Sequence, residues 1–314
     1  MMNRRAMMGA MSAGFVMAQV KVVIGQETKL IPLISKGFQH QFWQAVKAGA
    51  DQAAAEFGVE MTFEGPDSEA QVDRQIDMLA AALAKGPAAI GFAALDSQAA
   101  IPLLRQAQDA GIPVVAFDSG VDSDIPVTTC TTDNAAAAGL AADKMAEFIG
   151  GSGKVAVVAH DQTSRTGIDR RDGFVNGIAK HAGIEVVTIQ YGGGDQLQST
   201  EITKSILTAN PDLKGVFGTN EGSAIGVVNG VRENGAEGVV IIGYDSGAAQ
   251  KEAVRSGLMA GAITQNPVGI GYETVKAAVM SANGETVAPL IDTGFYYYDA
   301  SNIDDAEIDA VLYD

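Results

Sequence analysis

From residue 29 onward, short runs of apolar and β-branched residues alternate with longer stretches whose apolar residues recur at helical spacing. This alternation predicts repeated β-α-β units, and therefore parallel sheets covered by helices. Two of the expected strands, residues 113–117 and 239–244, are apolar almost throughout. Such strands are typical of sheets that helices cover on both faces. The expected fold class is therefore α/β.

The order of the elements predicts two tandem α/β halves, and the length of 314 residues also favours about two domains. The expected strands are residues 29–35, 59–64, 88–93, 113–117, 126–131, 154–159, 185–190, 214–218, 238–244 and 259–264. The expected helices are residues 41–57, 68–85, 97–110, 133–149, 165–182, 196–209, 221–234, 247–256 and 267–283. Pro32 cannot donate a hydrogen bond to a neighbouring strand, so its strand is expected to be bulged or to lie at an edge.

The charge of the chain argues against one class of partner. With 21 basic and 38 acidic residues, the net charge is −17, whereas nucleic-acid binding needs a basic face that replaces phosphate counterions. No nucleic-acid partner is therefore expected. The excess of acidic residues neither favours nor excludes binding of a neutral small ligand.

The N-terminus and the cysteine content indicate the compartment. Residues 1–18 have the pattern of a signal peptide, in which Arg4 and Arg5 precede an apolar run too short to span a bilayer. The single cysteine, Cys130, lies in an apolar and Thr-rich run and is expected to be a buried small hydrophobe. An exported chain without internal disulfides fits a bacterial periplasm.

Several catalytic and cofactor motifs are incomplete or absent. The segment GGSGK at residues 150–154 resembles a phosphate-binding loop, but it lacks the required spacing and precedes a strand, so a turn is expected there. His40, His160 and His181 match no metal-ligand spacing. No Gly-x-Ser-x-Gly segment provides a nucleophile. We therefore expect no catalytic residue, no metal and no cofactor.

Polar residues recur directly after the expected strands. The carboxyl ends of parallel strands are where open α/β sheets bind ligands, so these residues are expected to converge there. Their carboxylates accept hydroxyl hydrogen bonds, and their amides both donate and accept. One group is the segment 35–41, which includes Lys36 and His40. The other residues are Glu64, Asp118, Ser119, His160, Asp161, Asn220, Asp245 and Gln265.

Two aromatic residues and an arginine complete the predicted set. Phe42 and Trp43 begin the helix after the first strand, and Trp43 is the only tryptophan of the chain. Aromatic rings suit a ligand with flat C–H faces as well as hydroxyls, although packing in the core is an alternative for both. Arg170 can supply several donors from a helix of the second half. Together these groups suit a polyhydroxylated ligand.

The chain also resembles a known family. In order, it contains SKGFQHQFWQAVKAGA, PVVAFDS, TTDNAAAAG, DRRDGF, GVFGTNEGSAIG, VIIGYDS and AITQNP. Over nearly all of residues 28–300, this series resembles periplasmic binding proteins of the ribose-binding type, the solute-binding components of ABC importers. The resemblance implies the type I periplasmic binding protein fold, which has two Rossmann-like lobes joined by three crossover strands and ligand in the cleft.

The lobes that the resemblance implies interrupt the linear order. An N-terminal lobe is expected at residues 19–132 and 265–292, and a C-terminal lobe at residues 133–264 and 293–314. The first lobe would contribute Lys36, His40, Phe42, Trp43, Asp118 and Ser119 to the ligand site. The second lobe would contribute Arg170, Asn220 and Asp245, and Gln265 would contact ligand at a hinge crossing.

The chain departs from the ribose-binding pattern at three positions. His40 stands where ribose binders usually carry Asn, and Ser119 stands where they carry Arg after the strand-end Asp. An aromatic residue expected in the second lobe falls near Gly194, which has no side chain. A ligand other than ribose is therefore expected, and specificity is expected to be decided at His40.

The resemblance implies a function for the chain. We expect a monomeric periplasmic protein, not an enzyme, that captures a monosaccharide, polyol or amino sugar by lobe closure and delivers it to a membrane permease. A sugar sensor that presents its closed lobes to a chemoreceptor is an alternative. A carbohydrate-processing enzyme is a second alternative.

Overall fold

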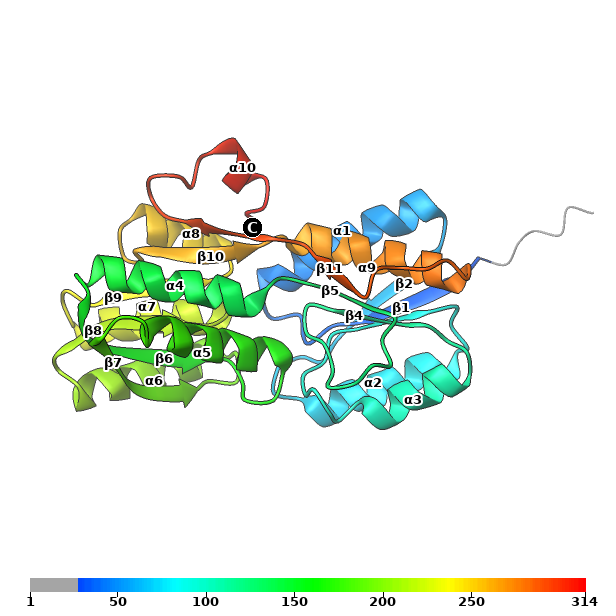
Figure 1. The fold of residues 1–314 in the computed structure, drawn as a ribbon, viewed down its shortest axis with the longest axis horizontal. Helices are drawn as coiled ribbons and strands as arrows, with labels where there is room; N and C mark the ends of the chain where they lie inside the picture. The colour runs from blue at the N-terminus through cyan, green and yellow to red at the C-terminus, as the bar shows by residue number, and fades with distance from the viewer. Residues whose placement is uncertain (1–27) are drawn as a thin grey trace, which may run out of the picture.

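The computed structural model describes residues 28–314. The expected signal peptide, residues 1–18, therefore lies outside the described residues. Figure 1 shows an elongated molecule made of two α/β halves that lie end to end. Each half has a six-stranded sheet with helices on both faces, as the alternation of the sequence predicts.

The first sheet has the strand order β11-β5-β4-β3-β1-β2, and all of its neighbouring strands are parallel. Its strands are β1 (Leu30–Ile34), β2 (Glu60–Glu64), β3 (Ile90–Phe92), β4 (Val114–Phe117), β5 (Thr128–Thr131) and β11 (Leu290–Asp292). Helices α1 (Gln41–Phe57) and α9 (Pro267–Ala282) cover one face. Helices α2 (Val72–Ala84) and α3 (Ile101–Asp109) cover the other.

The second sheet has the order β12-β10-β9-β8-β6-β7, and only its edge strand β12 is antiparallel. Its strands are β6 (Ser152–Ala159), β7 (Gly183–Tyr191), β8 (Leu213–Gly218), β9 (Val240–Tyr244), β10 (Gly261–Gln265) and β12 (Phe295–Tyr298). Its helices are α4 (Asn134–Phe148), α5 (Arg165–Ile178), α6 (Gln196–Ala209), α7 (Glu221–Asn234), α8 (Ala248–Arg255) and the short α10 (Ala306–Asp309). Among the described helices, none is both long and apolar enough to cross a membrane.

The chain passes between the halves three times, between β5 and α4, between β10 and α9, and between β11 and β12. The two tandem halves expected from the order of elements are therefore wrong, because α9 and β11 return to the first half. This topology is that of the type I periplasmic binding protein fold. The residue bounds of the two lobes stay a prediction, and Gln265 pairs within β10 of the second sheet.

The packing of α1 against α9 depends on small residues at the contact. An added Cβ on Gly49 of α1 would lie 1.9 Å from the Val268 carbonyl oxygen. An added Cβ on Gly271 of α9 would lie 1.9 Å from the Val46 carbonyl oxygen. The two helices therefore approach more closely than larger side chains would permit.

One local expectation for the first sheet is wrong, and one of its strands was missed. Pro32 does not mark an edge or a bulge, because β1 lies between β2 and β3 and its register with β2 runs without a shift. The residue pairs of β1 with β3 begin only at Leu33. Strand β11 was not predicted from the sequence. It has three residues and is parallel to β5.

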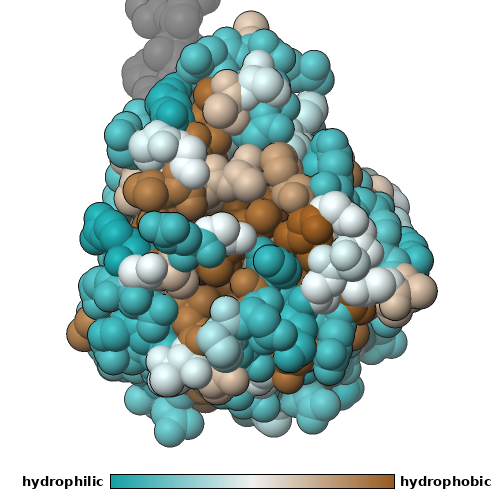
Figure 2. All heavy atoms as spheres, turned by 90° about the vertical axis from the view of Figure 1, so that its left-hand side faces the viewer, coloured by the Kyte–Doolittle hydropathy of each residue, from teal (hydrophilic) through white to brown (hydrophobic). Residues whose placement is uncertain are grey.

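The end of the second half has a mixed surface. Figure 2 shows apolar residues gathered in the middle of this face, with hydrophilic residues around them. Large exposed apolar side chains of this half include Phe148, Leu197 and Leu258. The site described next lies elsewhere, between the two halves.

Candidate ligand-binding site

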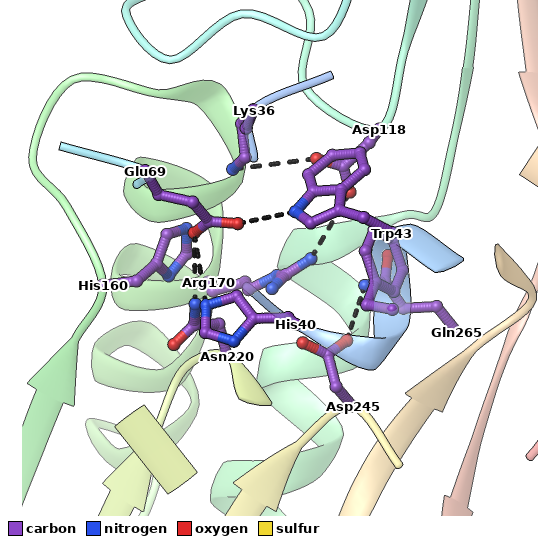
Figure 3. A pocket seen from close by; sticks show the side chains of 11 residues that line it. Lys36, His40, Trp43, Glu69, Asp118, His160, Arg170, Asn220, Asp245 and Gln265 are labelled. Carbon is purple, nitrogen blue, oxygen red and sulfur yellow. Dashed lines mark hydrogen bonds and ion pairs between the residues drawn. The ribbon is translucent and has the colours of Figure 1, made fainter. Parts of the chain in front are cut away.

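A cavity lies between the carboxyl ends of the strands of the two sheets, and its empty volume is about 250 Å³. Figure 3 shows the side chains pointing toward one another across the cavity. The lining residues are Lys36, His40, Phe42, Trp43, Glu69, Asp118, His160, Arg170, Asn220, Asp245 and Gln265.

Two aspartates hold equivalent positions at the ends of β4 and β9. Asp118 has φ 54° and Asp245 has φ 79°. Apart from glycines, no other described residue has a positive φ. Aspartate tolerates this left-handed conformation better than most residues, but the conformation still costs free energy. Each of the two buried carboxylates lies at the cavity, where an unusual backbone conformation most often serves a site.

The aromatic pair at the start of α1 belongs both to the core and to the cavity. Phe42 and Trp43 are 5 % and 1 % exposed, and their rings meet edge to face with centroids 5.0 Å apart. Trp43 also packs edge to face on Phe117. Its indole N–H donates to Glu69 Oε1 at 2.8 Å. The two interpretations offered by the sequence, core packing and cavity lining, thus both apply.

Arg170 is the buried cation of the second half. Its Nε donates to Asn134 Oδ1 at 2.8 Å, and its Nη1 donates to the Thr219 carbonyl oxygen at 2.9 Å. Its guanidinium carbon lies 3.8 Å from the centroid of the Tyr244 ring. Its Nη2 is 4.0 Å from Asp118 Oδ1, across the cavity. These contacts fix the guanidinium so that it faces the first half.

Lys36 is the buried cation of the first half. Its Nζ lies 3.7 Å from Asp118 Oδ2, and it donates to Thr166 Oγ1 of α5 at 2.9 Å. Burial raises the pKa of the Asp118 carboxyl more than the nearby cations Lys36 and Arg170 lower it, so its pKa lies above the usual value. Asp118 Oδ2 has no hydrogen-bond partner among the described residues. It is therefore available to a donor from a ligand.

Amides and a neutral histidine line the second half of the cavity. Gln265 Nε2 donates to Asp245 Oδ1 at 2.8 Å, while Gln265 Oε1 has no partner among the described residues. Burial lowers the pKa of His160 to about 3, Asp161 opposes this effect, and Lys36 and Arg170 add to it. His160 is therefore neutral near pH 7. Its Nδ1 lies 2.7 Å from Thr219 Oγ1.

Nine of the ten predicted ligand-binding residues line this cavity, and the exception is Ser119. Ser119 is buried, but it is not among the lining residues, and its hydroxyl has no partner among the described residues. Glu64 also departs from the expected convergence, because its carboxylate lies 3.6 Å from Lys85 Nζ outside the cavity. Whether the nine residues bind ligand stays a prediction.

Sequence reasoning missed Glu69 and did not select His160 as a binding residue. His160 follows β6 and was recognisable by that position. Glu69 lies in the loop between β2 and α2, away from any strand end, and no periodic pattern marks it. Within residues 28–314, no group of His, Cys, Asp and Glu side chains could hold a metal ion.

Residues 31–286 match a family model described as a periplasmic binding protein domain. The D-allose-binding periplasmic protein of Escherichia coli (strain K12) is 26% identical over 267 residues, which cover 82% of this chain and 86% of that protein. Relatives of this kind are sugar-binding transport proteins.

Solved structures show the same similarity. An ABC transporter solute-binding protein from Agrobacterium vitis, bound with alpha-D-tagatopyranose, is 31% identical with a TM-score of 0.87, covering 91% of this chain and 100% of that chain. A second solute-binding protein from Agrobacterium vitis, with bound D-fucose, is 33% identical with a TM-score of 0.88, covering 90% and 100%.

Proposed function

The chain belongs to the family of periplasmic binding protein domains, and on that premise we propose that it captures one small carbohydrate between its two halves. Monosaccharides, polyols and amino sugars are the proposed ligand class. The protein then delivers the ligand to the permease of an ABC importer. The proposed location is the periplasm.

The observation that carries this proposal is the composition of the cavity. Buried carboxylates, amides and one guanidinium face the same space as the Phe42 and Trp43 rings. Such groups hydrogen-bond hydroxyls, while the rings contact C–H faces.

Ligand stabilises the closed arrangement because it contacts both halves at once. Asp118 and Trp43 belong to elements of the first sheet, and Arg170 and Asn220 belong to elements of the second. A ligand held between them has more contacts in the closed form than in the open form. An affinity of about 1 μM corresponds to about −8 kcal/mol, which several buried hydrogen bonds and one ring contact can supply.

A thermal-shift screen tests this function. Pentoses, hexoses, polyols and amino sugars are added singly, and a sugar that binds only the native state raises the melting temperature. At least one of them is expected to raise it at millimolar concentration. If none of the four classes does so, the carbohydrate proposal fails.

The proposal includes binding without turnover, because the relatives are transport proteins. The test is prolonged incubation of the pure protein with the sugar that raises its melting temperature. The sugar is expected to be recovered unchanged by chromatography. Sustained formation of a product would contradict this part of the proposal.

A further inference from the structure

Three carboxylates among the described residues line the cavity, and Glu69 differs from the other two in its origin. Asp118 and Asp245 follow β-strands, whereas Glu69 comes from the loop before α2. Its side chain is 7% exposed. Figure 3 shows its carboxylate directed at the space between His40, Trp43 and Asn220.

The two oxygens of Glu69 have different surroundings. Oε1 accepts the indole N–H of Trp43 at 2.8 Å, which fixes the carboxylate. Oε2 accepts only a long hydrogen bond of 3.3 Å, from Asn220 Nδ2. A carboxylate oxygen can accept two hydrogen bonds. Oε2 therefore retains capacity for a second, stronger donor.

His40 Nε2 is the polar atom nearest to this free capacity. It lies 4.0 Å from Glu69 Oε2, which is too far for a hydrogen bond between them. It is buried and has no hydrogen-bond partner among the described residues. One hydroxyl oxygen can stand at a normal distance of about 2.8 Å from both atoms. A buried, unpaired polar atom in such a position points to a ligand group.

The second half leaves room for these two groups by means of glycines. An added Cβ on Gly194 would lie 2.8 Å from Glu69 Oε2, and one on Gly222 would lie 2.7 Å from His40 Cε1. A side chain at Gly194 would displace Glu69, and one at Gly222 would displace the Gly194 carbonyl oxygen, at 2.1 Å, as well as His40. Gly194 also lies near the position where the family resemblance implies an aromatic residue. Glu69 thus lies against a position that a ring would otherwise fill.

The charge state of Glu69 suits a hydroxyl donor. Burial raises its pKa, but His40, Lys36, His160 and the indole hydrogen bond outweigh that effect, and the net pKa is lowered. The carboxylate is therefore ionised at neutral pH. Hydrogen bonds to ionised acceptors are about twice as strong as neutral ones.

We propose that Glu69 and His40 form a specificity subsite for one hydroxyl group of the bound sugar. The hydroxyl donates to Glu69 Oε2 and accepts from His40 Nε2–H. A sugar that lacks this hydroxyl leaves both buried atoms unpaired and is bound more weakly. This inference rests on the proposed function and assigns the residues that select among sugars.

The test is calorimetric titration of wild type and E69Q with D-tagatose, D-arabinose, D-galactose and the monodeoxy analogues of each. For every parent sugar that wild type binds, E69Q is expected to bind about 10- to 100-fold more weakly, the change that corresponds to loss of a hydrogen bond to a charged group. In wild type, removal of one particular hydroxyl is expected to cause a similar loss. In E69Q, removal of that same hydroxyl is expected to cause a smaller loss than in wild type, because only its hydrogen bond from His40 remains to be lost.

Two further variants separate this role from a merely structural one. H40A is expected to reduce the penalty for the same deoxy analogue, because it removes the other partner of that hydroxyl. E60Q changes an exposed glutamate of β2 in the same half and is expected to bind like wild type. The melting temperature of sugar-free E69Q is measured alongside, since its amide oxygen can still accept from Trp43.

The outcomes that overturn the inference are distinct from those that overturn the function. If wild type binds a sugar and E69Q binds it equally well, the subsite is wrong while the proposed function stands. The same holds if E69Q lowers the affinity for a parent sugar and for all its deoxy analogues by the same factor. If wild type binds none of these sugars, the titrations are repeated with the sugar that raises the melting temperature in the thermal-shift screen. If no sugar of the four classes does so, the proposed function fails and the subsite fails with it.

Discussion

The Glu221 carboxylate, at the start of α7, accepts a hydrogen bond of 3.1 Å from the backbone N–H of Phe42, in the first turn of α1 across the cleft. Its other oxygen accepts from the backbone N–H of Gln41, also at 3.1 Å. The first N–H groups of a helix have no partner within the helix, and the side chain of His40 does not cap α1. A residue of the second half therefore caps a helix of the first.

The E221A variant is expected to weaken sugar binding about tenfold, although Glu221 does not line the cavity. The closed form would lose the acceptor of two N–H groups, whereas water can satisfy them in the open form. Sugar-free E221A is also expected to be more extended in small-angle scattering. The control is E233A on the same helix, which pairs with Lys204 and should leave both measurements unchanged. Equal affinities for E221A and E233A would contradict this role.

The R170A variant is expected to abolish detectable sugar binding and to destabilise the sugar-free protein by about 3–5 kcal/mol. It removes the hydrogen bonds to Asn134 and to the Thr219 carbonyl, and it leaves Asp118 opposed by Lys36 alone. Calorimetry and urea unfolding measure the two effects. The matched control is R171A, because Arg171 is partly exposed and bonds only Asp172 and Tyr191 among the described residues. R170A behaving like R171A would refute the role of Arg170.

Sugar binding is expected to change the fluorescence of Trp43, the only tryptophan of the chain. The indole lines the cavity and its N–H bonds Glu69, so a ligand that replaces water there alters the surroundings of the ring. The emission spectrum is recorded during titration, and W43F supplies the background. Binding detected by calorimetry without any change in tryptophan emission would show that the ligand lies elsewhere.

Acid is expected to destabilise the fold through His160. Because burial lowers its pKa from 6.5 to about 3, the unfolded chain takes up a proton below pH 6.5 that the folded chain does not. The free energy of unfolding should therefore fall as the pH falls, by about 2 kcal/mol between pH 6.5 and pH 5. In urea unfolding, the H160Q variant should lose this part of the pH dependence of the free energy of unfolding. The control is H181Q, whose histidine contacts Asp143 outside the cavity, and it should keep the full pH dependence. The same pH dependence for wild type and H160Q would exclude the effect.

The G49A variant is expected to lower the free energy of unfolding by about 1–3 kcal/mol. The added methyl group would meet the Val268 carbonyl at 1.9 Å, so α1 and α9 would have to separate. Gly139 of α4 is the control, because the nearest atom to its added Cβ is 3.9 Å away. G139A should be neutral or stabilise by about 0.5–1 kcal/mol, as expected for alanine in a helix. Equal stabilities of the two variants in urea unfolding would refute the close packing.

The sequence predicted the helices better than their arrangement. The expected ranges 41–57, 196–209 and 221–234 are the observed bounds of α1, α6 and α7, because helical periodicity is a local property of the chain. Strand β11 has no such signal. Leu290 is 58% exposed, and the strand forms only because β5 lies beside it. A partner distant in sequence cannot be read from three residues.

The candidate site was predictable where residues follow strands. Asp118, Asn220, Asp245 and Gln265 were found in this way, because the carboxyl ends of parallel strands meet at one edge of the sheet. The same rule misplaced Glu64, whose carboxylate lies beside Lys85 instead of the cavity. It also missed Glu69, which reaches the cavity from a loop through its bond with Trp43. That contact depends on tertiary folding.

The packing of α1 against α9 also has a consequence for the newly made chain. Residues 41–57 leave the ribosome long before residues 267–282, so the side of α1 that packs on α9 has no partner until synthesis is nearly complete. The edge strand β11 of the first sheet arrives later still. Contacts between segments so distant in sequence form slowly. The first half therefore cannot complete its core until synthesis is nearly finished.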